Sequence, residues 1–239
     1  MKDIEELINS KKKYKKAKLQ KRLEGKKNTV SYVLLNDKPR VIKWFAPGLQ
    51  RNMETEYSIL KKGSSKLDIP ILLEKDENNN VLVLNYIMGE NLCDVINSEE
   101  TSSDEKKRLM ILLGRWFAQF HTHFKTADQY RIRGDAILRN FILTDRIYGV
   151  DFEESRFGKP VEDIATMCAS ILSTDPMFTN EKIQLCRTFI DSYEKSVKWG
   201  LMNVSNEIAY ALLERIQWRP DDEDALRKFS ERIRINGLR

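Results

Sequence analysis

The first part of the chain changes from a helical to an alternating hydrophobic period near residue 16. Residues 2–16 place Ile4, Leu7 and Ile8 among charged side chains, and this spacing predicts a surface helix. Beyond it, short apolar runs between turn-forming residues predict β-strands. The predicted strands cover residues 19–23, 30–35, 40–45, 68–73 and 80–87.

One helix interrupts these strands. Residues 51–62 carry Met53, Tyr57 and Leu60 at the spacing of a single helical face. Gly63 follows directly, and glycine is the preferred residue where a helix ends. The N-terminal part of the chain is therefore expected to combine a small antiparallel sheet with one helix.

The second part of the chain has a helical period, apart from one hairpin. A helix is predicted from residue 92, and a longer one follows with Ser103 as its expected N-cap and Lys125 as its end. The hairpin has apolar runs at 141–143 and 147–151 around a short turn. After the hairpin, helices are predicted at residues 163–172, 181–199, 205–217 and 222–233.

Length and composition are those of a soluble protein with one domain or two closely packed lobes. The 239 residues are 41% hydrophobic and 32% charged. No apolar run approaches the roughly 18 residues of a membrane span, and the acidic first residues differ from a secretory signal. Cys93, Cys168 and Cys186 lack the paired spacing of a metal site. Their odd number favours reduced thiols in a cytoplasm.

The net charge of +5 is concentrated near the N-terminus, in the segment Lys11–Arg22. Such a basic segment is typical of proteins that bind RNA or an anionic membrane surface. The alternative, which we favour, is a charged helix exposed to solvent. Nucleic acid is therefore one candidate partner of this segment.

The predicted hairpin gathers residues suited to phosphoryl transfer. Asp135 precedes it, Asn140 follows five residues later, and Asp151 ends its second strand. Asn and Asp side chains supply the oxygen ligands that Mg²⁺ prefers, and Mg²⁺ also binds phosphate oxygens. A further carboxylate is needed to orient the hydroxyl that accepts a phosphoryl group. We therefore expect Asn140 and Asp151 to bind metal and Asp135 to be the catalytic carboxylate.

The same residues resemble a known family. Gly-Asp-x4-Asn at residues 134–140, followed by Asp-Phe-Glu at 151–153, resembles the kinase-like phosphotransferases. The pattern is most similar to the aminoglycoside and choline kinase branch, and residues 158–165 also resemble that branch. Arg133 departs from it, because the branch usually has His before Gly-Asp.

This resemblance implies an α+β fold with two lobes, like that of the protein kinases. Residues 1–88 would form the N-lobe, with the N-terminal helix and a small antiparallel sheet that covers the nucleotide. Residues 89–239 would form a mainly helical lobe that carries the catalytic and metal-binding hairpin. The implied cofactors are ATP and Mg²⁺.

The resemblance also implies a set of nucleotide-binding residues. Lys43 follows Val-Ile in the third predicted strand and would hold the α- and β-phosphates. Glu56 in the predicted helix would pair with Lys43, and Glu54 is the second choice. Gly25 and Asn28, in the turn between the first two strands, would cover the phosphates. The alternatives are an exposed lysine and a plain hairpin turn.

Five further residues have expected roles. Backbone groups of Tyr86 to Met88 would bind the adenine edge, although their side chains equally suit the core. His121 is expected to be structural, because no Cys or carboxylate is spaced to share a metal with it. Asp163 is expected to bond the backbone of the catalytic loop, or to favour a helix N-terminus, or both.

The implied reaction is transfer of the γ-phosphoryl group of ATP to a hydroxyl of a small molecule. Asp151 and Asp163 are only twelve residues apart, which excludes the long segment that binds peptide substrates in protein kinases. Glu153, Glu154 and residues 221–224 are candidate linings for a cationic acceptor, although 221–224 also suits a helix start.

Two other classes of function stay open. One is an atypical serine/threonine protein kinase linked to RNA maturation, which the basic N-terminal segment favours. The other is a pseudokinase that binds nucleotide without turnover, which Arg133 and the single glycine at Gly25 favour. The sequence leaves open the acceptor, the choice between ATP and GTP, and the oligomeric state.

Overall fold

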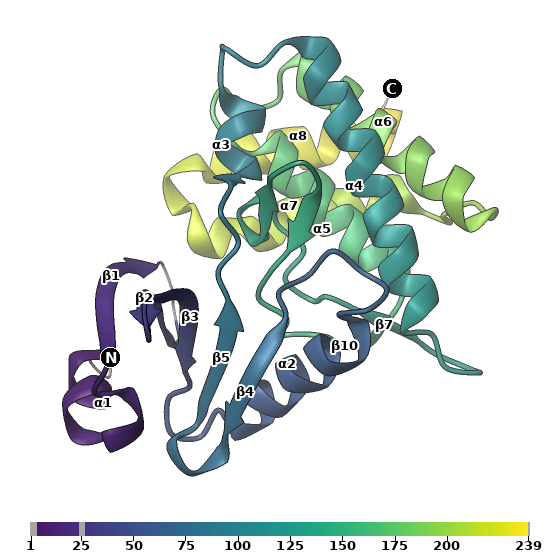
Figure 1. The fold of residues 1–239 in the computed structure, drawn as a ribbon. Helices are drawn as coiled ribbons and strands as arrows, with labels where there is room; N and C mark the ends of the chain where they lie inside the picture. Colours follow the sequence, from purple (N-terminus) through teal and green to yellow (C-terminus); the bar gives the residue numbers. More distant parts are fainter. Residues whose placement is uncertain (1–3, 24–26, 239) are drawn as a thin grey trace. The chain divides into compact units, whose positions relative to one another are not determined.

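The computed structural model describes residues 4–23 and 27–238 (Figure 1). These residues form two compact units. The N-terminal unit comprises the described residues up to 88 together with residues 151–154, and the helical unit comprises residues 89–150 and 155–238. A short stretch that follows the predicted hairpin therefore belongs to the unit that contains the sheet.

The described strands of the N-terminal unit form a five-stranded antiparallel sheet in the order β1-β2-β3-β5-β4. Their bounds are β1 Ala17–Leu23, β2 Thr29–Leu35, β3 Lys38–Trp44, β4 Leu72–Asp76 and β5 Val81–Asn85. Asn36 and Asp37 both have positive φ, at 53° and 57°, as a tight two-residue hairpin turn requires. The predicted sheet is confirmed, and β3 runs through its middle with Lys43 opposite Val30 and Leu82.

The N-terminal helix is shorter than predicted. Helix α1 spans Ile4–Ser10, a 3₁₀ turn follows at Lys12–Tyr14, and β1 begins at Ala17. The backbone at Lys11 is extended, which ends the helix. Tyr14 is buried, and its hydroxyl donates a hydrogen bond to Asp76 Oδ2 at 2.8 Å. This segment covers one face of the sheet, in an apolar cluster formed by Ile4, Leu7, Tyr14, Ala17, Val33, Ile42, Trp44, Val81 and Val83.

The fourth strand lies further along the chain than predicted. It spans Leu72–Asp76 instead of residues 68–73, and a 3₁₀ turn at Glu77–Asn79 leads to Asn80 at φ 56°. Proline at position 70 lacks the N–H that a central part of a ladder needs. Residues 74–76 belong to the strand because they pair with Val83, Leu82 and Val81 of β5.

Helix α2, Gln50–Gly63, confirms the predicted helix and packs against β4 and β5. Its buried face carries Met53, Ile59 and Leu60, with Glu56 among them. A carboxylate in the middle of an apolar face needs a partner of opposite charge. Glu56 is therefore the first indication of a site in this unit.

The helical unit contains the remaining described elements. They are β6 Glu90–Asn91, α3 Leu92–Asn97, α4 Ser103–His123, β7 Tyr130–Ile132, a 3₁₀ turn η3 Leu138–Asn140, β8 Phe141–Leu143, β9 Ile147–Gly149, β10 Arg156–Gly158, α5 Pro160–Leu172, α6 Asn180–Val197, α7 Val204–Glu214, η4 Arg215–Trp218, η5 Pro220–Asp222 and α8 Glu223–Asn236. Helix α4 packs along α6, and both α5 and α8 pack on α7. All the predicted helices are present, with ends shifted by a few residues.

The long helix α4 has its N-cap at Ser102, one residue before the expected Ser103. The Ser102 hydroxyl accepts a hydrogen bond from the Glu105 N–H at 3.2 Å. Gly114 allows α4 to approach α6 closely, because a Cβ at this position would lie 2.7 Å from the Phe189 carbonyl oxygen. Aromatic side chains of α4 then fill the interior of this unit.

The predicted hairpin is confirmed. Phe141 on β8 pairs with Gly149 on β9, and the Thr144 N–H closes the turn on the Arg146 carbonyl at 2.8 Å. Gly149 has no room for a side chain, since a Cβ would lie 2.4 Å from the Trp116 ring. The hairpin is thus fixed against α4 directly before Asp151.

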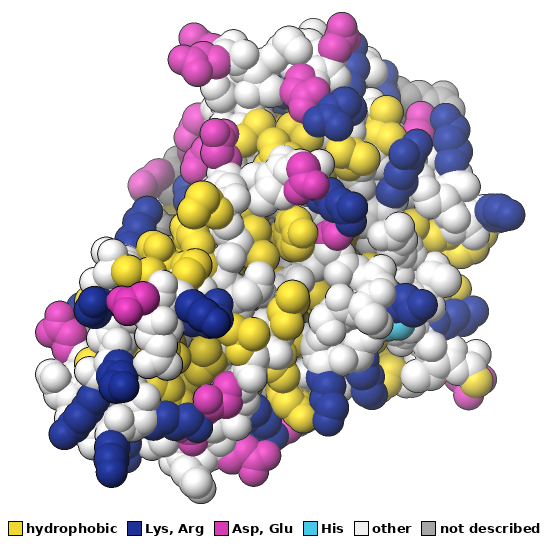
Figure 2. All heavy atoms as spheres, viewed as in Figure 1, with side chains coloured by type: hydrophobic (Ala, Val, Ile, Leu, Met, Phe, Trp, Pro, Cys, Tyr) yellow, Lys and Arg dark blue, Asp and Glu magenta, His cyan; other side chains and the backbone are white. Residues whose placement is uncertain are grey.

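Four observations concern the surface and the cysteines. No described helix is both long enough and apolar enough to cross a membrane. Cys93, Cys168 and Cys186 are buried free thiols. In the basic segment, Lys13 pairs with Glu74 and Lys18 with Asp37, the latter at 3.2 Å. Basic and acidic side chains are also interspersed on the face shown in Figure 2.

Candidate functional site

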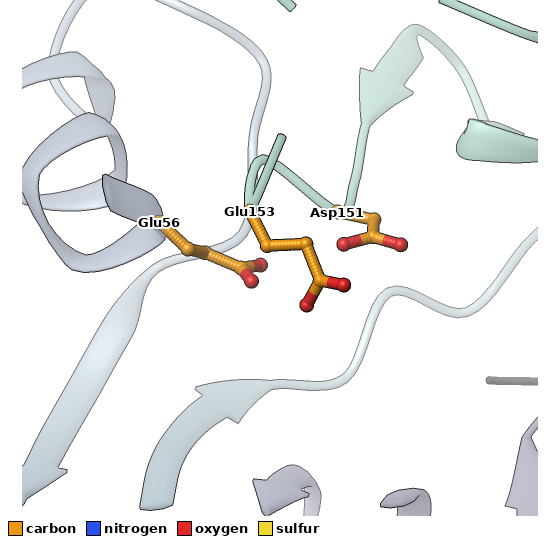
Figure 3. A group of neighbouring side chains, drawn as sticks. All are labelled: Glu56, Asp151 and Glu153. Atoms are coloured by element: carbon orange, nitrogen blue, oxygen red, sulfur yellow. The ribbon is translucent and has the colours of Figure 1, made fainter. Parts of the chain in front are cut away.

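Lys43 lies at the centre of a cluster of charged residues in the N-terminal unit. Lys43 is only 4% exposed, which excludes the alternative of a strand lysine that points into solvent. Its Nζ lies 2.6 Å from Glu56 Oε2, 2.6 Å from Asp151 Oδ1 and 2.8 Å from Glu153 Oε2. Figure 3 shows these three carboxylates directed toward the same space, Glu56 from α2 and the others from the segment after β9.

Burial and charge act in opposite directions within this cluster. Burial lowers the pKa of Lys43, but the charges of Glu56, Asp151 and Glu153 outweigh it and raise the pKa above its ordinary value. Burial raises the pKa of Glu56 to about 7, and Lys43 only partly opposes this. One ammonium group therefore faces three carboxylates, and burial disfavours the charged form of the most buried of them, Glu56.

The predicted pair of Lys43 and Glu56 is thus present as a contact. Glu54, the second choice, pairs with Lys75 instead, at 2.6 Å. The contact with Glu153 was not foreseen. The sequence could have indicated this contact, because a glutamate stands at position 153, where the Asp-Phe-Gly pattern has a glycine.

The predicted phosphate-covering residues lie in a turn that is described only in part. Gly25 lies outside the described residues. Asn28 is buried, donates to Glu153 through Nδ2 and accepts the Ala46 N–H at 3.1 Å through Oδ1. Lys27 pairs with Glu154 at 2.5 Å. Glu153 and Glu154, expected to line an acceptor pocket, are therefore bound by residues of the sheet's first turn.

The residues predicted at the adenine edge follow β5. Tyr86 stacks on Tyr32 with ring centroids 4.1 Å apart, so its side chain is part of the sheet surface. Met88 is 78% exposed at the end of the N-terminal unit. Its side chain is therefore not part of the core, which was the alternative.

In the helical unit, Asp163 fixes the backbone of the loop that precedes Asp135. Its carboxylate accepts the Arg133 N–H at 2.7 Å and the Gly134 N–H at 3.1 Å, which confirms the prediction for Asp163. Gly134 has φ +80°, a conformation that favours glycine. His121 Nε2 lies 3.0 Å from the same carboxylate and Nδ1 lies 2.9 Å from the Tyr193 hydroxyl, so His121 is structural as expected.

The loop then presents Asp135 and Asn140 together. Asn140 Nδ2 donates to the Asp135 backbone oxygen at 3.0 Å and to Asp135 Oδ2 at 3.1 Å. The Asn140 amide oxygen is thereby oriented away from these bonds as a potential ligand atom. The Asn140 backbone oxygen accepts the Val150 N–H at 2.9 Å, which holds the residue directly before Asp151.

Arg133, the departure from the family pattern, is fully buried and structural. Its Nη2 donates to the Val150 carbonyl oxygen at 2.6 Å. Its guanidinium lies 5.4 Å from the Trp116 ring centre and 4.8 Å from that of Phe141. Val150 is therefore bonded at both its N–H and its C=O, and Asp151 follows with φ 62°.

The donor atoms suit a magnesium ion. Ligand oxygens of Glu56, Asp151 and Glu153 all lie within 4.8 Å of one another in the N-terminal unit. All these donors are oxygens, as Mg²⁺ prefers, and the described residues of the cluster offer no sulfur or imidazole ligand.

A cavity of about 730 Å³ elsewhere in the helical unit is separate from these residues. It is lined by residues of β7, β10 and the loop at 199–203, with Trp199 and Phe157 among them. None of the predicted site residues lines it. It is therefore not part of the candidate site.

Comparison with known proteins gives matches in structure but not in sequence. Neither the protein-family models nor the curated proteins match this chain. A solved aminoglycoside phosphotransferase from Ralstonia eutropha is 12% identical, with a TM-score of 0.65 over 96% of each chain. A choline kinase from Streptococcus pneumoniae is 16% identical, with a TM-score of 0.63 over 98% of this chain and 97% of that one.

A third match has ligands in its structure. It is a thermostable aminoglycoside phosphotransferase solved with ADP and hygromycin B, 12% identical, with a TM-score of 0.63 over 96% of each chain. Likeness at this level of identity shows the fold. The chain has the kinase-like phosphotransferase fold, in the form found in aminoglycoside phosphotransferases and choline kinases.

Proposed function

We propose that this protein is an ATP- and Mg²⁺-dependent phosphotransferase that moves the γ-phosphoryl group to a hydroxyl of a small molecule. The observation that carries the proposal is the buried contact of Lys43 with both Glu56 and Asp151. A kinase-like fold uses a strand lysine paired with a helix glutamate for the nucleotide phosphates, and the aspartate that follows the hairpin for Mg²⁺.

Each candidate residue has one role in the proposal. Lys43 binds the α- and β-phosphates, and Glu56 keeps its ammonium group in place. Asn140 and Asp151 are the metal ligands. Asp135 accepts a hydrogen bond from the acceptor hydroxyl and orients it for attack. Bound Mg²⁺ would neutralise charge on the phosphate oxygens.

Other parts of the proposal concern the nucleotide, the location and the acceptor. The turn with Gly25 and Asn28 covers the phosphates, and backbone groups from Tyr86 to Met88 contact the adenine. The buried free thiols support a cytoplasmic location. A small acceptor is supported by the chain between Asp151 and α5, which contains only a turn and β10 and no long peptide-binding segment.

The test is phosphate transfer from labelled ATP, with pooled hydroxylated metabolites in one arm and generic proteins in the other. Wild type should label a metabolite. Asp135→Asn should lower kcat by about 100-fold or more and leave ATP affinity unchanged. Asp145→Asn, in the exposed turn of the same hairpin, is the control and should behave as wild type.

Each contrary result points to a named alternative. Rapid stoichiometric labelling of one protein, with no labelled metabolite, would replace the proposal with the atypical protein kinase. Nucleotide binding without any transfer would support the pseudokinase. Full turnover in Asp135→Asn would show that Asp135 is not the catalytic carboxylate.

A further inference from the structure

Among the carboxylates around Lys43, Glu153 is the one without a role in the proposed function. Its carboxylate lies 2.8 Å from Lys43 Nζ and accepts a hydrogen bond from Asn28 Nδ2. Its backbone oxygen accepts a hydrogen bond from Asn52 Nδ2 at 3.3 Å. Glu153 therefore connects β3, the turn before β2 and helix α2, all within the N-terminal unit.

The carboxylate of Glu153 is held beside Lys43 instead of pointing into solvent. The Glu153 side chain is only 10% exposed. Its partner Asn28 is buried, and the Asn28 Oδ1 accepts the Ala46 N–H at 3.1 Å, so the amide group of Asn28 has a fixed orientation toward Glu153. Figure 3 shows the carboxylate of Glu153 between those of Glu56 and Asp151.

The three carboxylates use all the binding capacity of the Lys43 ammonium group. A lysine ammonium carries three N–H donors, and three carboxylate oxygens lie within 2.8 Å of Lys43 Nζ. Even with Glu56 protonated, one ammonium group and two carboxylates carry a net negative charge. A phosphate group that approaches Lys43 is therefore repelled until a negative charge is neutralised or displaced.

The three carboxylates differ in how they can make room for a phosphate oxygen. Glu56 is 1% exposed on the buried face of α2 and keeps Lys43 in place in the proposed function. The side chain of Asp151 is 42% exposed, and this residue is a proposed metal ligand. Glu153 is left as the carboxylate whose position beside Lys43 Nζ a phosphate oxygen has to take.

We propose that Glu153 makes nucleotide binding dependent on Mg²⁺, because its carboxylate competes with the nucleotide phosphates for Lys43. This inference rests on the proposed function and names the residue that limits access to its phosphate site. Positive charge from a metal ion at Asp151 would reduce the net negative charge of the cluster, so that phosphate can replace Glu153 beside Lys43. Without that positive charge, Glu153 keeps its contact and excludes the nucleotide.

The test is calorimetric titration of the protein with pyrophosphate and with ADP, in EDTA in one series and in Mg²⁺ in the other. Wild type should bind both probes weakly in EDTA. Glu153→Gln keeps an oxygen that can accept the Asn28 hydrogen bond and removes the charge. In EDTA it should therefore bind both probes about 10- to 100-fold more tightly than wild type. In Mg²⁺ the two proteins should bind ADP with dissociation constants within about threefold of each other.

Three further variants separate the charge of Glu153 from its packing. Glu153→Asp keeps a carboxylate, so in EDTA it should bind the probes as weakly as wild type does. Glu153→Ala removes the charge together with the Asn28 hydrogen bond and should gain affinity in EDTA. It replaces Glu153→Gln if that variant does not fold. The control is Glu77→Gln, since Glu77 is an exposed residue of the same unit that pairs with Lys75 at 2.6 Å. It should bind the probes as wild type does.

The inference is overturned if Glu153→Gln binds pyrophosphate and ADP in EDTA no better than wild type, or if Glu153→Asp gains as much affinity as Glu153→Gln. It is also overturned if Glu153→Gln loses ADP binding in Mg²⁺, because Glu153 would then assist the metal and not compete with phosphate. Failure of the proposed function looks different. Wild type then binds no ADP in Mg²⁺, while Glu153→Gln still gains affinity for pyrophosphate in EDTA.

Discussion

Removal of the Lys43 charge should destabilise the protein by an amount that depends on pH. Lys43→Met keeps the length of the buried side chain and removes the ammonium group. Glu56, Asp151 and Glu153 then face one another without a cation, although their nearest ligand oxygens lie within 4.8 Å. Glu56 is 1% exposed and cannot be solvated, so its pKa must rise beyond the value of about 7 that it has beside Lys43.

The expected loss of stability follows from the numbers of protons that the folded and the unfolded protein bind. The pKa of Glu56 is raised in the folded protein, so between about pH 4.5 and 7 the folded state binds more protons than the unfolded one, and stability falls as pH rises through this window. In Lys43→Met the pH range in which stability falls extends above pH 7. Each further pH unit lowers the free energy of unfolding by about 1.4 kcal/mol. We expect a loss of about 1–2 kcal/mol at pH 6, where Glu56 is already mostly protonated, and about 2–3 kcal/mol at pH 8.

The assay is urea denaturation at both pH values, with Lys18→Met as the control. Lys18 is an exposed residue of β1 that pairs with the exposed Asp37, so its loss should cost less than about 1 kcal/mol at either pH. In the double variant Lys43→Met/Glu56→Gln, the loss should be smaller than the sum of the single losses by about 1–3 kcal/mol. The claim that Lys43 stabilises the buried Glu56 would be refuted by a loss of stability that is the same at both pH values. Strictly additive losses in the double variant would refute it as well.

Three further variants test the packing that supports the site, each by urea denaturation. Asp163→Asn should cost about 2–4 kcal/mol, because it weakens two backbone hydrogen bonds and the contact with His121, and cooperative unfolding at wild-type stability would exclude this role. Tyr14→Phe should cost about 1–3 kcal/mol through the lost bond to Asp76, whereas the exposed Tyr210→Phe should change stability by less than about 0.5 kcal/mol. Gly114→Ala should cost about 1–3 kcal/mol, and an unchanged stability would mean that α4 and α6 can separate without loss.

The loop with Asp135 and Asn140 and the hairpin after it were predictable because their sequence patterns are local. The spacing of Asp135 and Asn140 lies within one loop, and the two apolar runs of the hairpin flank a three-residue turn closed at 2.8 Å. Asp163 was also predictable, because the resemblance to kinase-like folds implies an aspartate at this helix start that bonds the backbone of the preceding loop. Each of these depends on residues that are close in sequence or on a pattern with known spacing.

Long-range contacts explain the errors. The N-terminal helix ends early because Tyr14 bonds Asp76, which lies 62 residues further along the chain, and β4 reaches Asp76 because residues 74–76 pair with β5. The cationic charge expected of the acceptor stays a prediction from the sequence. The availability of the run at 221–224 depends on contacts that the structure shows, because Arg219 binds Asp222 at 2.5 Å and Arg227 binds Glu223 at 2.7 Å.

Calorimetric titration with ATP tests the central claim most directly. Wild type should bind ATP only when Mg²⁺ is present. Asp151→Asn should keep the fold by circular dichroism and bind Mg²⁺ and ATP at least 10- to 100-fold more weakly, the order of loss found when a metal site is impaired. Absence of ATP binding by wild type, or equal binding by wild type and Asp151→Asn, would contradict the account.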